Sequence, residues 1–149
     1  MKFHFTFFQT PAVRKVSPIA IALRNAIRSI AQFVAETELE ELTEFRLSII
    51  ALSDPEMLEL NRSALGHDWL TDVIAFEIDR SGGMLEAEIY VSPERAYENA
   101  KRFRQPPELE ILHLVIHGVL HLAGYNDKSP NGKKQMRARE RWYLVRFRS

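Results

Sequence analysis

Two histidines placed one helical turn apart are the residues of this sequence best suited to chemistry. His117 and His121 lie four residues apart in the segment 111–127, ILHLVIHGVLHLAGYND, and side chains at this spacing point the same way from a helix. The spacing is a common way for a helix to offer two imidazole ligands to one metal ion. Gly124 can end the helix, because glycine adopts the left-handed conformation at low cost. The chain can then turn back toward the rings, which predicts a metal site formed by His117, His121 and Asp127, with open positions for water or substrate.

The helix that carries these histidines is expected to be buried. Isoleucine, leucine and valine fill most positions from 111 to 122, so the helix is apolar on nearly every side. Each histidine in it needs a polar partner, because a buried polar group without one is costly. A shared cation would satisfy His117 and His121 together. His113 lies one turn earlier on the same face, where it either supports or lines the site or is a hydrogen-bonded core histidine.

The same ligand spacing occurs in metzincin proteases, which carry a glutamate directly after the first histidine as general base. Here that position is Gly118. A peptidase of this type is therefore disfavoured.

A closer resemblance lies in the stretch HGVLHLAGY, from His117 to Tyr125. It resembles the signature HGxLHLxGYDH of the YbeY family, which are metal-dependent endoribonucleases linked to ribosomal RNA maturation. The third ligand of that signature is a histidine in the eleventh place, and here the eleventh place is Asp127. A carboxylate can replace an imidazole at zinc, although it changes the charge and the metal preference. We expect zinc, with iron, manganese or nickel as alternatives, because two histidines and one carboxylate also suit other transition metals.

Two further blocks carry the resemblance across more of the chain. A family stretch of the form LNxxYRxxDxxTDVLSF is matched at Leu60, Asn61, Asp68, Thr71, Asp72, Val73 and Phe76. A second stretch, G-[DE]-I-x-[IV]-S, is matched at Glu88, Ile89, Val91 and Ser92, with Ala87 in place of the glycine.

One mismatch bears on catalysis. The family often has an arginine, thought to aid catalysis, where this chain has Leu65, and a leucine cannot bind or polarise a phosphate. Arg62, His67 or Arg95 could supply the missing positive charge, and each also fits an ordinary surface role.

Two acidic residues are candidates for orienting the histidines. Metal-bound imidazoles usually donate their second N–H to a carboxylate or a carbonyl. Glu88 and Asp72 could accept such hydrogen bonds, or could be plain strand or turn residues.

Length and composition limit the class of protein. A chain of 149 residues predicts one domain, 1–149, with 46% hydrophobic and 27% charged residues as in globular proteins. It has no cysteine, which excludes disulfides and thiolate ligands and is compatible with a reducing cytoplasm. The first residues, MKFHFTFFQTP, are too short and mixed for a secretory signal, and no run reaches the roughly 20 apolar residues of a membrane span.

The formal net charge of zero hides an asymmetry along the chain. The segment 35–44 holds five glutamates and no lysine or arginine, whereas the segment 133–148 holds seven basic residues against Glu140 alone. The basic residues are Lys133, Lys134, Arg137, Arg139, Arg141, Arg146 and Arg148. Such a segment beside the metal motif could contact a nucleic acid, or it could be the solvated face of a helix.

Hydrophobic periodicity predicts an α+β fold with a small mixed sheet of about four strands around the buried His-bearing helix. The expected strands are 2–8, 45–52, 72–78 and 85–91, the last two forming a hairpin across 79–83. The first expected helix covers 19–38 and begins after Ser17-Pro18. A short helix is expected from 53–55 through Leu60, and another over 92–103. The His helix is expected to begin at 107 and a basic helix at 129–130. Segments 11–17 and 61–71 are expected to be a connector and a loop. The resemblance implies the same arrangement.

The resemblance implies a hydrolase: a single-strand-specific endoribonuclease in 16S ribosomal RNA 3′-end maturation and ribosome quality control. Precursor ribosomal RNA would be the substrate, and ribosomal proteins or assembly factors are candidate partners. A cation held by His117, His121 and Asp127 would acidify a bound water and polarise a phosphoryl oxygen. We expect weaker catalysis than from three histidines, because the anionic Asp127 reduces the effective charge. The alternatives are a ribosome-assembly binding factor with a structural metal and a metallohydrolase for another substrate.

Overall fold

The structure, a computed structural model, describes residues 1–148. Four strands and six helices follow one another along this part of the chain. In order they are β1 (Lys2–Gln9), α1 (Pro11–Val16), α2 (Ile21–Glu38), β2 (Glu44–Ala51), α3 (Asp54–Leu65), β3 (Val73–Ser81), β4 (Met84–Val91), α4 (Pro93–Phe103), α5 (Pro107–Leu122) and α6 (Pro130–Arg148).

The strands form one mixed sheet in the order β1-β2-β4-β3. β1, β2 and β4 are parallel, so Phe5, Leu47 and Ala87 lie in one row across them. β3 runs antiparallel to β4. Gly82 and Gly83 join these two strands and both have positive φ, of 58° and 79°, which glycine tolerates best. The predicted α+β class and its small mixed sheet are confirmed.

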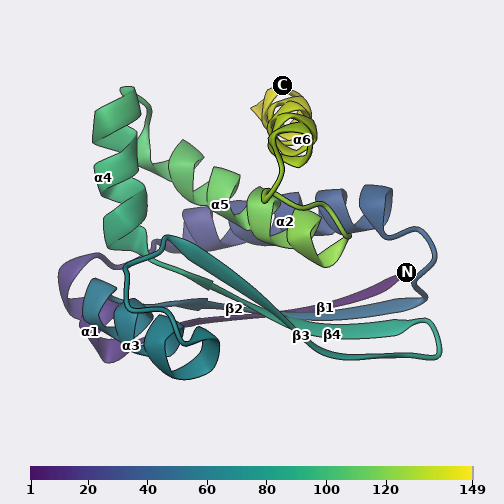
Figure 1. Cartoon of the computed structure of the whole chain (residues 1–149), viewed down its shortest axis with the longest axis horizontal. Helices are drawn as coiled ribbons and strands as arrows, with labels where there is room; N and C mark the ends of the chain where they lie inside the picture. Colours follow the sequence, from purple (N-terminus) through teal and green to yellow (C-terminus); the bar gives the residue numbers. More distant parts are fainter. Residues whose placement is uncertain (149) are drawn as a thin grey trace.

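One face of the sheet packs against the helices α2 and α5 (Figure 1). On β2 and β4 every second residue is buried, which is the pattern of strands with one face toward a core. Gly118 on α5 lies so close to β4 that a Cβ there would be 2.9 Å from Cδ1 of Ile89. The absent side chain therefore lets the His helix approach the sheet. α6 packs on α5 on the side away from the sheet.

The other face of the sheet carries a smaller core, which lies between the sheet and α3. Met57 of α3 is buried with Leu52 and Ile74, and Phe76 and Tyr90 pack against them. Figure 1 shows α1 and α3 together near one end of the strands. None of the helices in residues 1–148 is long and apolar enough to cross a membrane.

The N-terminal connector differs from its prediction. Residues 11–16 form α1, because the Thr10 hydroxyl accepts a hydrogen bond from the amide of Val13 and Pro11 fits the first turn. Ser17 ends this helix instead of beginning the next one, and α2 starts only at Ile21. The helix start predicted at Ser17-Pro18 was wrong, because a Ser-Pro pair can follow one helix as well as begin the next.

The loop predicted over 61–71 is also shorter than expected. A capping box between Ser53 and Glu56 starts α3, which continues to Leu65 and ends at Gly66 with φ 69°. The helix tolerates the polar residues 61–63 because Asn61 turns its side chain inward to the Trp69 carbonyl. β3 likewise continues through the predicted turn to Ser81.

Candidate metal centre

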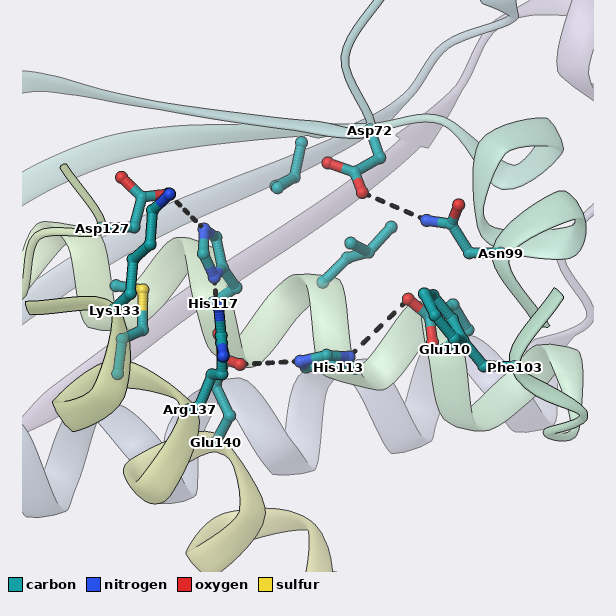
Figure 2. Close-up of a pocket in the computed structure, with 13 residues that line it drawn as sticks. Asp72, Asn99, Phe103, Glu110, His113, His117, Asp127, Lys133, Arg137 and Glu140 are labelled. Carbon is teal, nitrogen blue, oxygen red and sulfur yellow. Dashed lines mark hydrogen bonds and ion pairs between the residues drawn. The ribbon is translucent and has the colours of Figure 1, made fainter. Parts of the chain in front are cut away.

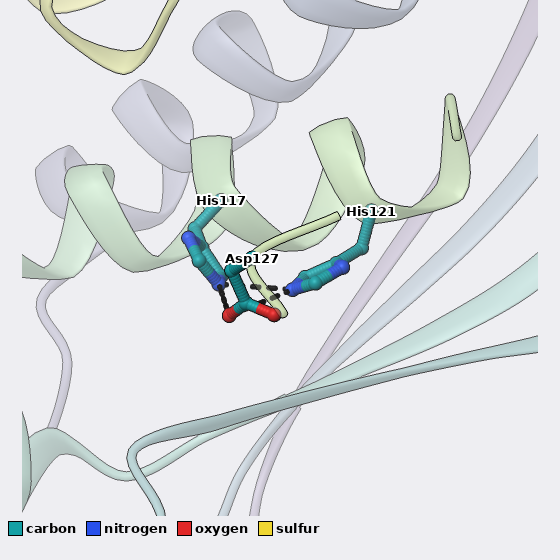
Figure 3. A group of neighbouring side chains, drawn as sticks. All are labelled: His117, His121 and Asp127. Carbon is teal, nitrogen blue, oxygen red and sulfur yellow. Dashed lines mark hydrogen bonds and ion pairs between the residues drawn. The ribbon is translucent and has the colours of Figure 1, made fainter. Parts of the chain in front are cut away.

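Three side chains meet beside the last turns of α5, as Figure 3 shows. Nε2 of His117 and Nε2 of His121 are 3.0 Å apart, and Oδ2 of Asp127 lies 3.5 Å and 3.6 Å from them. Ligand atoms around one tetrahedral zinc ion are roughly 3.3 Å apart, so the three atoms have nearly the spacing that a shared ion requires. All three residues are half-buried, which leaves one side of the group open. The donor set therefore fits a divalent transition metal.

The bend after α5 gives Asp127 its place. The amide of Gly124 donates to the carbonyl of His121, and the amide of Tyr125 donates to Leu120, which is the Schellman arrangement of a helix end. Gly124 has φ 101°, a conformation that residues with a Cβ rarely adopt.

The start of α6 then closes over the loop. A Cβ on Gly132 would lie 2.6 Å from the carbonyl oxygen of Asn126, so the two backbones approach as only a glycine allows. Asn126 in turn accepts a hydrogen bond from the Lys128 amide. These contacts hold the segment on both sides of Asp127.

Glu140 of α6 connects two histidines of α5, as Figure 2 shows. Its Oε2 lies 2.5 Å from Nδ1 of His117, and its Oε1 lies 2.8 Å from Nε2 of His113. Glu140 is buried, so a carboxylate there needs these partners. By accepting the Nδ1 proton of His117, it leaves Nε2 with a free lone pair on the side of His121 and Asp127. No local sequence pattern indicates this role, and the one available signal is that Glu140 is the only acidic residue of the basic segment 133–148.

The charges around Glu140 stabilise one another. Burial acts to raise the pKa of Glu140, but its hydrogen bonds to His113 and His117 outweigh burial and hold the pKa well below its usual range. Burial acts to lower the pKa of His113, but Glu110 and Glu140 raise it well above the ordinary histidine value. His113 is therefore a hydrogen-bonded histidine between two carboxylates, beside the site.

His121 has the opposite shift. Burial, followed by the nearby charge of His117, lowers its pKa, and Asp127 and the Tyr125 backbone only partly compensate. A lowered pKa favours the neutral imidazole, which is the form that binds a metal ion.

A second carboxylate holds the loop and α6 against α2. Glu38, at the end of α2, accepts hydrogen bonds from the hydroxyl groups of Tyr125 and Tyr143 and from Arg139. Burial acts to raise the pKa of Glu38, and the hydrogen bonds from Tyr143, Arg139 and Tyr125 lower it below its ordinary value. Arg139 and Glu140 are adjacent in α6, so this helix is attached to α2 and to α5 by neighbouring residues.

Two cavities meet at the candidate metal centre. A cavity of about 380 Å³ is lined by His113, His117 and Asp127 together with residues of α4 and α6. A second cavity, of about 810 Å³, is lined by His121 and Asp127 together with residues of β3 and the loop after α3. Because Asp127 lines both cavities, a ligand can extend to either side of the centre.

The smaller cavity has a basic wall. Lys133 and Arg137 line it, and both also line a groove of about 680 Å³ with Lys128, Lys134 and Arg141. Among the described side chains, none of these five cations has an acidic partner at ion-pair distance. Part of the predicted basic segment thus faces the site, while the side chain of Arg148 lies outside the described ones.

The two predicted orienting carboxylates have other partners. Asp72 lines the smaller cavity, but its side chain accepts a hydrogen bond from Asn99 at 3.2 Å. Glu88 accepts a hydrogen bond from Tyr90. Neighbouring residues of a strand point to opposite faces of the sheet, and the next residue, Ile89, faces α5. Glu88 therefore lies on the sheet face away from the histidines.

Of the three cationic candidates, only His67 reaches the site. Arg62 is paired with Asp68 at 2.7 Å, and Arg95 is paired with Asp54 at 3.1 Å. His67 lines the larger cavity beside Leu65 and stacks on Trp69. No sequence motif indicated Trp69, which is an exposed tryptophan in a polar loop.

Comparisons with known proteins agree with this architecture. The family described as Endoribonuclease YbeY matches residues 13–148. A protein of Flavobacterium psychrophilum named "Endoribonuclease YbeY" is 43% identical over 101 residues, which cover 68% of this chain and 71% of the relative. A protein of the same name from Cytophaga hutchinsonii is 36% identical over 117 residues, covering 78% of this chain and 80% of the relative.

The fold also resembles a Thermotoga maritima protein whose structure was solved in solution. The match has a TM-score of 0.63 and 28% sequence identity, and it covers 96% of this chain and 88% of the other. With the family match extending over nearly all of the described residues, this chain belongs to the Endoribonuclease YbeY family.

Proposed function

We propose that this chain is a metal-dependent endoribonuclease that cleaves single-stranded RNA in 16S ribosomal RNA 3′-end maturation and in ribosome quality control. The observation that carries the proposal is the convergence of the donor atoms of His117, His121 and Asp127 where two cavities meet. Membership of the family supports the reaction type. We also propose that the chain acts in the cytoplasm, where precursor rRNA would be its substrate, with ribosomal proteins or assembly factors as partners.

The three ligands are His117 and His121, each through Nε2, and Asp127 through Oδ2. We expect zinc, with iron, manganese or nickel as alternatives that the same donors accept. When bound, the cation would lower the pKa of a water molecule and polarise a phosphoryl oxygen. Glu140 holds the ring of His117, so that Nε2 would be available to the bound ion.

The cationic side chains of α6 bind the phosphates of the RNA in this proposal. Lys133 and Arg137 line the same cavity as His117 and Asp127, so they can neutralise the phosphates beside the one that is cleaved. They supply the positive charge for binding phosphate that Leu65, which lines the other cavity, cannot supply.

Activity is expected to be modest for two reasons. Gly118 packs against Ile89, so no side chain follows His117 to act as a general base. Asp127 adds a negative charge to the ligand set, which reduces the positive charge available to activate water.

The test is single-turnover cleavage of an RNA fragment that spans the 3′ end of 16S rRNA, with and without a chelator. We expect cleavage of the single-stranded fragment, loss of cleavage with chelator or in His121→Ala, and protection when the fragment is annealed to its complement. His4→Ala, which changes an exposed histidine of β1, is the matched control and should cleave normally. Equal cleavage with and without chelator contradicts the proposal.

Leu65 favours a second candidate function. It lines the cavity beside His121 and has no charge with which to stabilise a transition state. The chain would then be an RNA- or protein-binding assembly factor whose metal is structural. If His121→Ala keeps RNA affinity and restores growth to a strain lacking the protein, binding is the function, and cleavage is not. A hydrolase for another substrate would be identified by a panel of peptides, amides and phosphodiesters.

A further inference from the structure

A stacked pair of aromatic rings stands on the wall of the larger cavity. The rings of His67 and Trp69 have centroids 4.2 Å apart and are inclined by 15°, which is a parallel stack. Both residues line the cavity that also contains His121 and Asp127. We propose that this pair is a stacking site for one unpaired nucleobase of the strand held at the metal centre. The inference rests on the proposed function and adds a base-binding site to it.

The loop that presents the pair is fixed by its own polar contacts. Asn61 is buried and donates to the Trp69 carbonyl at 2.6 Å, while the His67 amide donates to the Asn61 carbonyl at 3.2 Å. Arg62 donates two hydrogen bonds to Asp68, the residue that lies between His67 and Trp69 in the sequence. The backbone that carries both rings is therefore held by contacts within the loop itself.

The indole is not used to build the core. Trp69 remains 59% exposed although Asn61 binds its backbone carbonyl. A core tryptophan would bury most of its large surface, since burial of aromatic area is strongly favourable. An exposed indole on a fixed loop at the edge of a cavity is available for a ligand.

The chemistry of the surroundings indicates the occupant. Every nucleobase offers a flat π-face, and stacking on tryptophan or histidine binds bases with little regard to sequence. Leu65 adds apolar wall and Lys128 adds a cation at the same cavity, while the acidic Glu77 of the lining is paired with Arg80. Lys128 also lines the basic groove of α6, so a polyanion fits these surroundings better than the apolar side chain of a protein partner. The phosphates would follow α6 while a base on the other side of the metal centre stacks on Trp69.

The experiment combines protein variants with modified RNA. Trp69→Ala and Trp69→Phe are compared in single-turnover kcat/KM on the single-stranded 16S fragment, and Phe8→Ala, which removes an exposed aromatic ring on β1, is the matched control. Loss of one stacked base corresponds to roughly a 5- to 100-fold decrease in kcat/KM for Trp69→Ala. Trp69→Phe should retain most of the activity, and Phe8→Ala should equal the wild type.

Modified RNA tests the site without changing the protein. A series of substrates, each with one abasic position near the cleaved bond, should contain one position whose loss mimics Trp69→Ala in the wild-type enzyme. At that position Trp69→Ala should cause no further decrease, because the base and the ring then act as one pair. 2-Aminopurine placed there should be quenched by the wild-type protein and not by Trp69→Ala.

The outcomes separate the two proposals. If the wild type cleaves the fragment, but the abasic series is flat and Trp69→Ala is unaffected, the stacking site is wrong and the nuclease stands. If Trp69→Ala instead loses only the binding of a ribosomal protein, the nucleobase is also the wrong occupant. If the wild type neither binds nor cleaves the RNA, the proposed function fails and the stacking site fails with it.

Discussion

The carboxylate of Glu140 lies 2.5 Å from Nδ1 of His117, across the boundary between α6 and α5. Through its other oxygen the same carboxylate contacts His113 at 2.8 Å. A single buried side chain thus attaches the C-terminal helix to the candidate metal centre. It also sets which nitrogen of His117 is free to bind.

Replacing this carboxylate tests the connection. Glu140→Gln keeps the shape of the side chain but removes the charge that pairs with His113 and weakens the acceptor for His117. We expect zinc affinity to fall about 10- to 100-fold, which is the usual effect of losing a group that orients a metal-bound histidine. Competition with a chelating dye measures this affinity directly. Glu108→Gln, at an exposed position of α5, is the control and should bind zinc normally.

The basic wall of the smaller cavity predicts a salt dependence. In Lys133→Gln/Arg137→Gln, RNA affinity should fall and the slope of log K against log salt should decrease by roughly 0.7 for each lost contact with a single-strand phosphate. Fluorescence anisotropy with a labelled single-stranded RNA at several salt concentrations measures both effects. Lys15→Gln/Arg28→Gln removes two exposed cations from α1 and α2 and provides the matched control. An unchanged slope in the first pair would mean that the phosphates bind elsewhere.

The approach of α5 to β4 predicts a stability effect at Gly118. Its Cβ would lie 2.9 Å from Cδ1 of Ile89, so Gly118→Ala should lower the free energy of unfolding by about 1–3 kcal/mol, although alanine is the better helix former. Ile89→Val removes Cδ1 and should relieve part of this strain. Urea denaturation of both single variants and of the double variant should therefore show less than additive destabilisation. Strict additivity would argue against a steric cause.

The Glu38 cluster predicts a pH dependence of stability. The folded-state pKa of Glu38 lies below its ordinary value of 4.5, because the hydrogen bonds from Tyr143, Arg139 and Tyr125 outweigh burial. Its contribution is therefore present above about pH 4.5 and is lost as the pH falls through the folded-state pKa. Glu38→Gln should cost about 2–3 kcal/mol at neutral pH.

Chemical denaturation at several pH values measures this difference. The gap between wild type and Glu38→Gln should narrow steadily below pH 4.5, because the unfolded chain then takes up a proton that the folded carboxylate binds only at lower pH. Glu36→Gln, at an exposed position of the same helix, should show no such gap. A gap of constant size down to acidic pH would show that Glu38 acts through packing and not through its charge.

Local pattern was sufficient for several elements of the fold. The alternation in β1 and β2, the proline-led starts of α4, α5 and α6, and the glycine after α5 each depend on residues close together in sequence. The predicted helix boundaries were wrong where one sequence pattern suits two structures. Ser17-Pro18 could begin a helix or follow one, and the polar residues 61–63 fit either a loop or an exposed helix surface. Alternation in β4 indicated two faces but could not say that Glu88 lies on the face away from α5.

The sequence by itself determined the spacing of His117 and His121 and the bend that returns Asp127 toward them, because helix geometry and glycine conformation act over a few residues. Only the tertiary structure decided that Glu140, 23 residues from His117, supports that ring, and that Trp69 borders the same cavity. Such contacts depend on how α6 and the loop after α3 pack on the core. That packing is set by the burial of whole helix and sheet faces, which local sequence patterns do not specify.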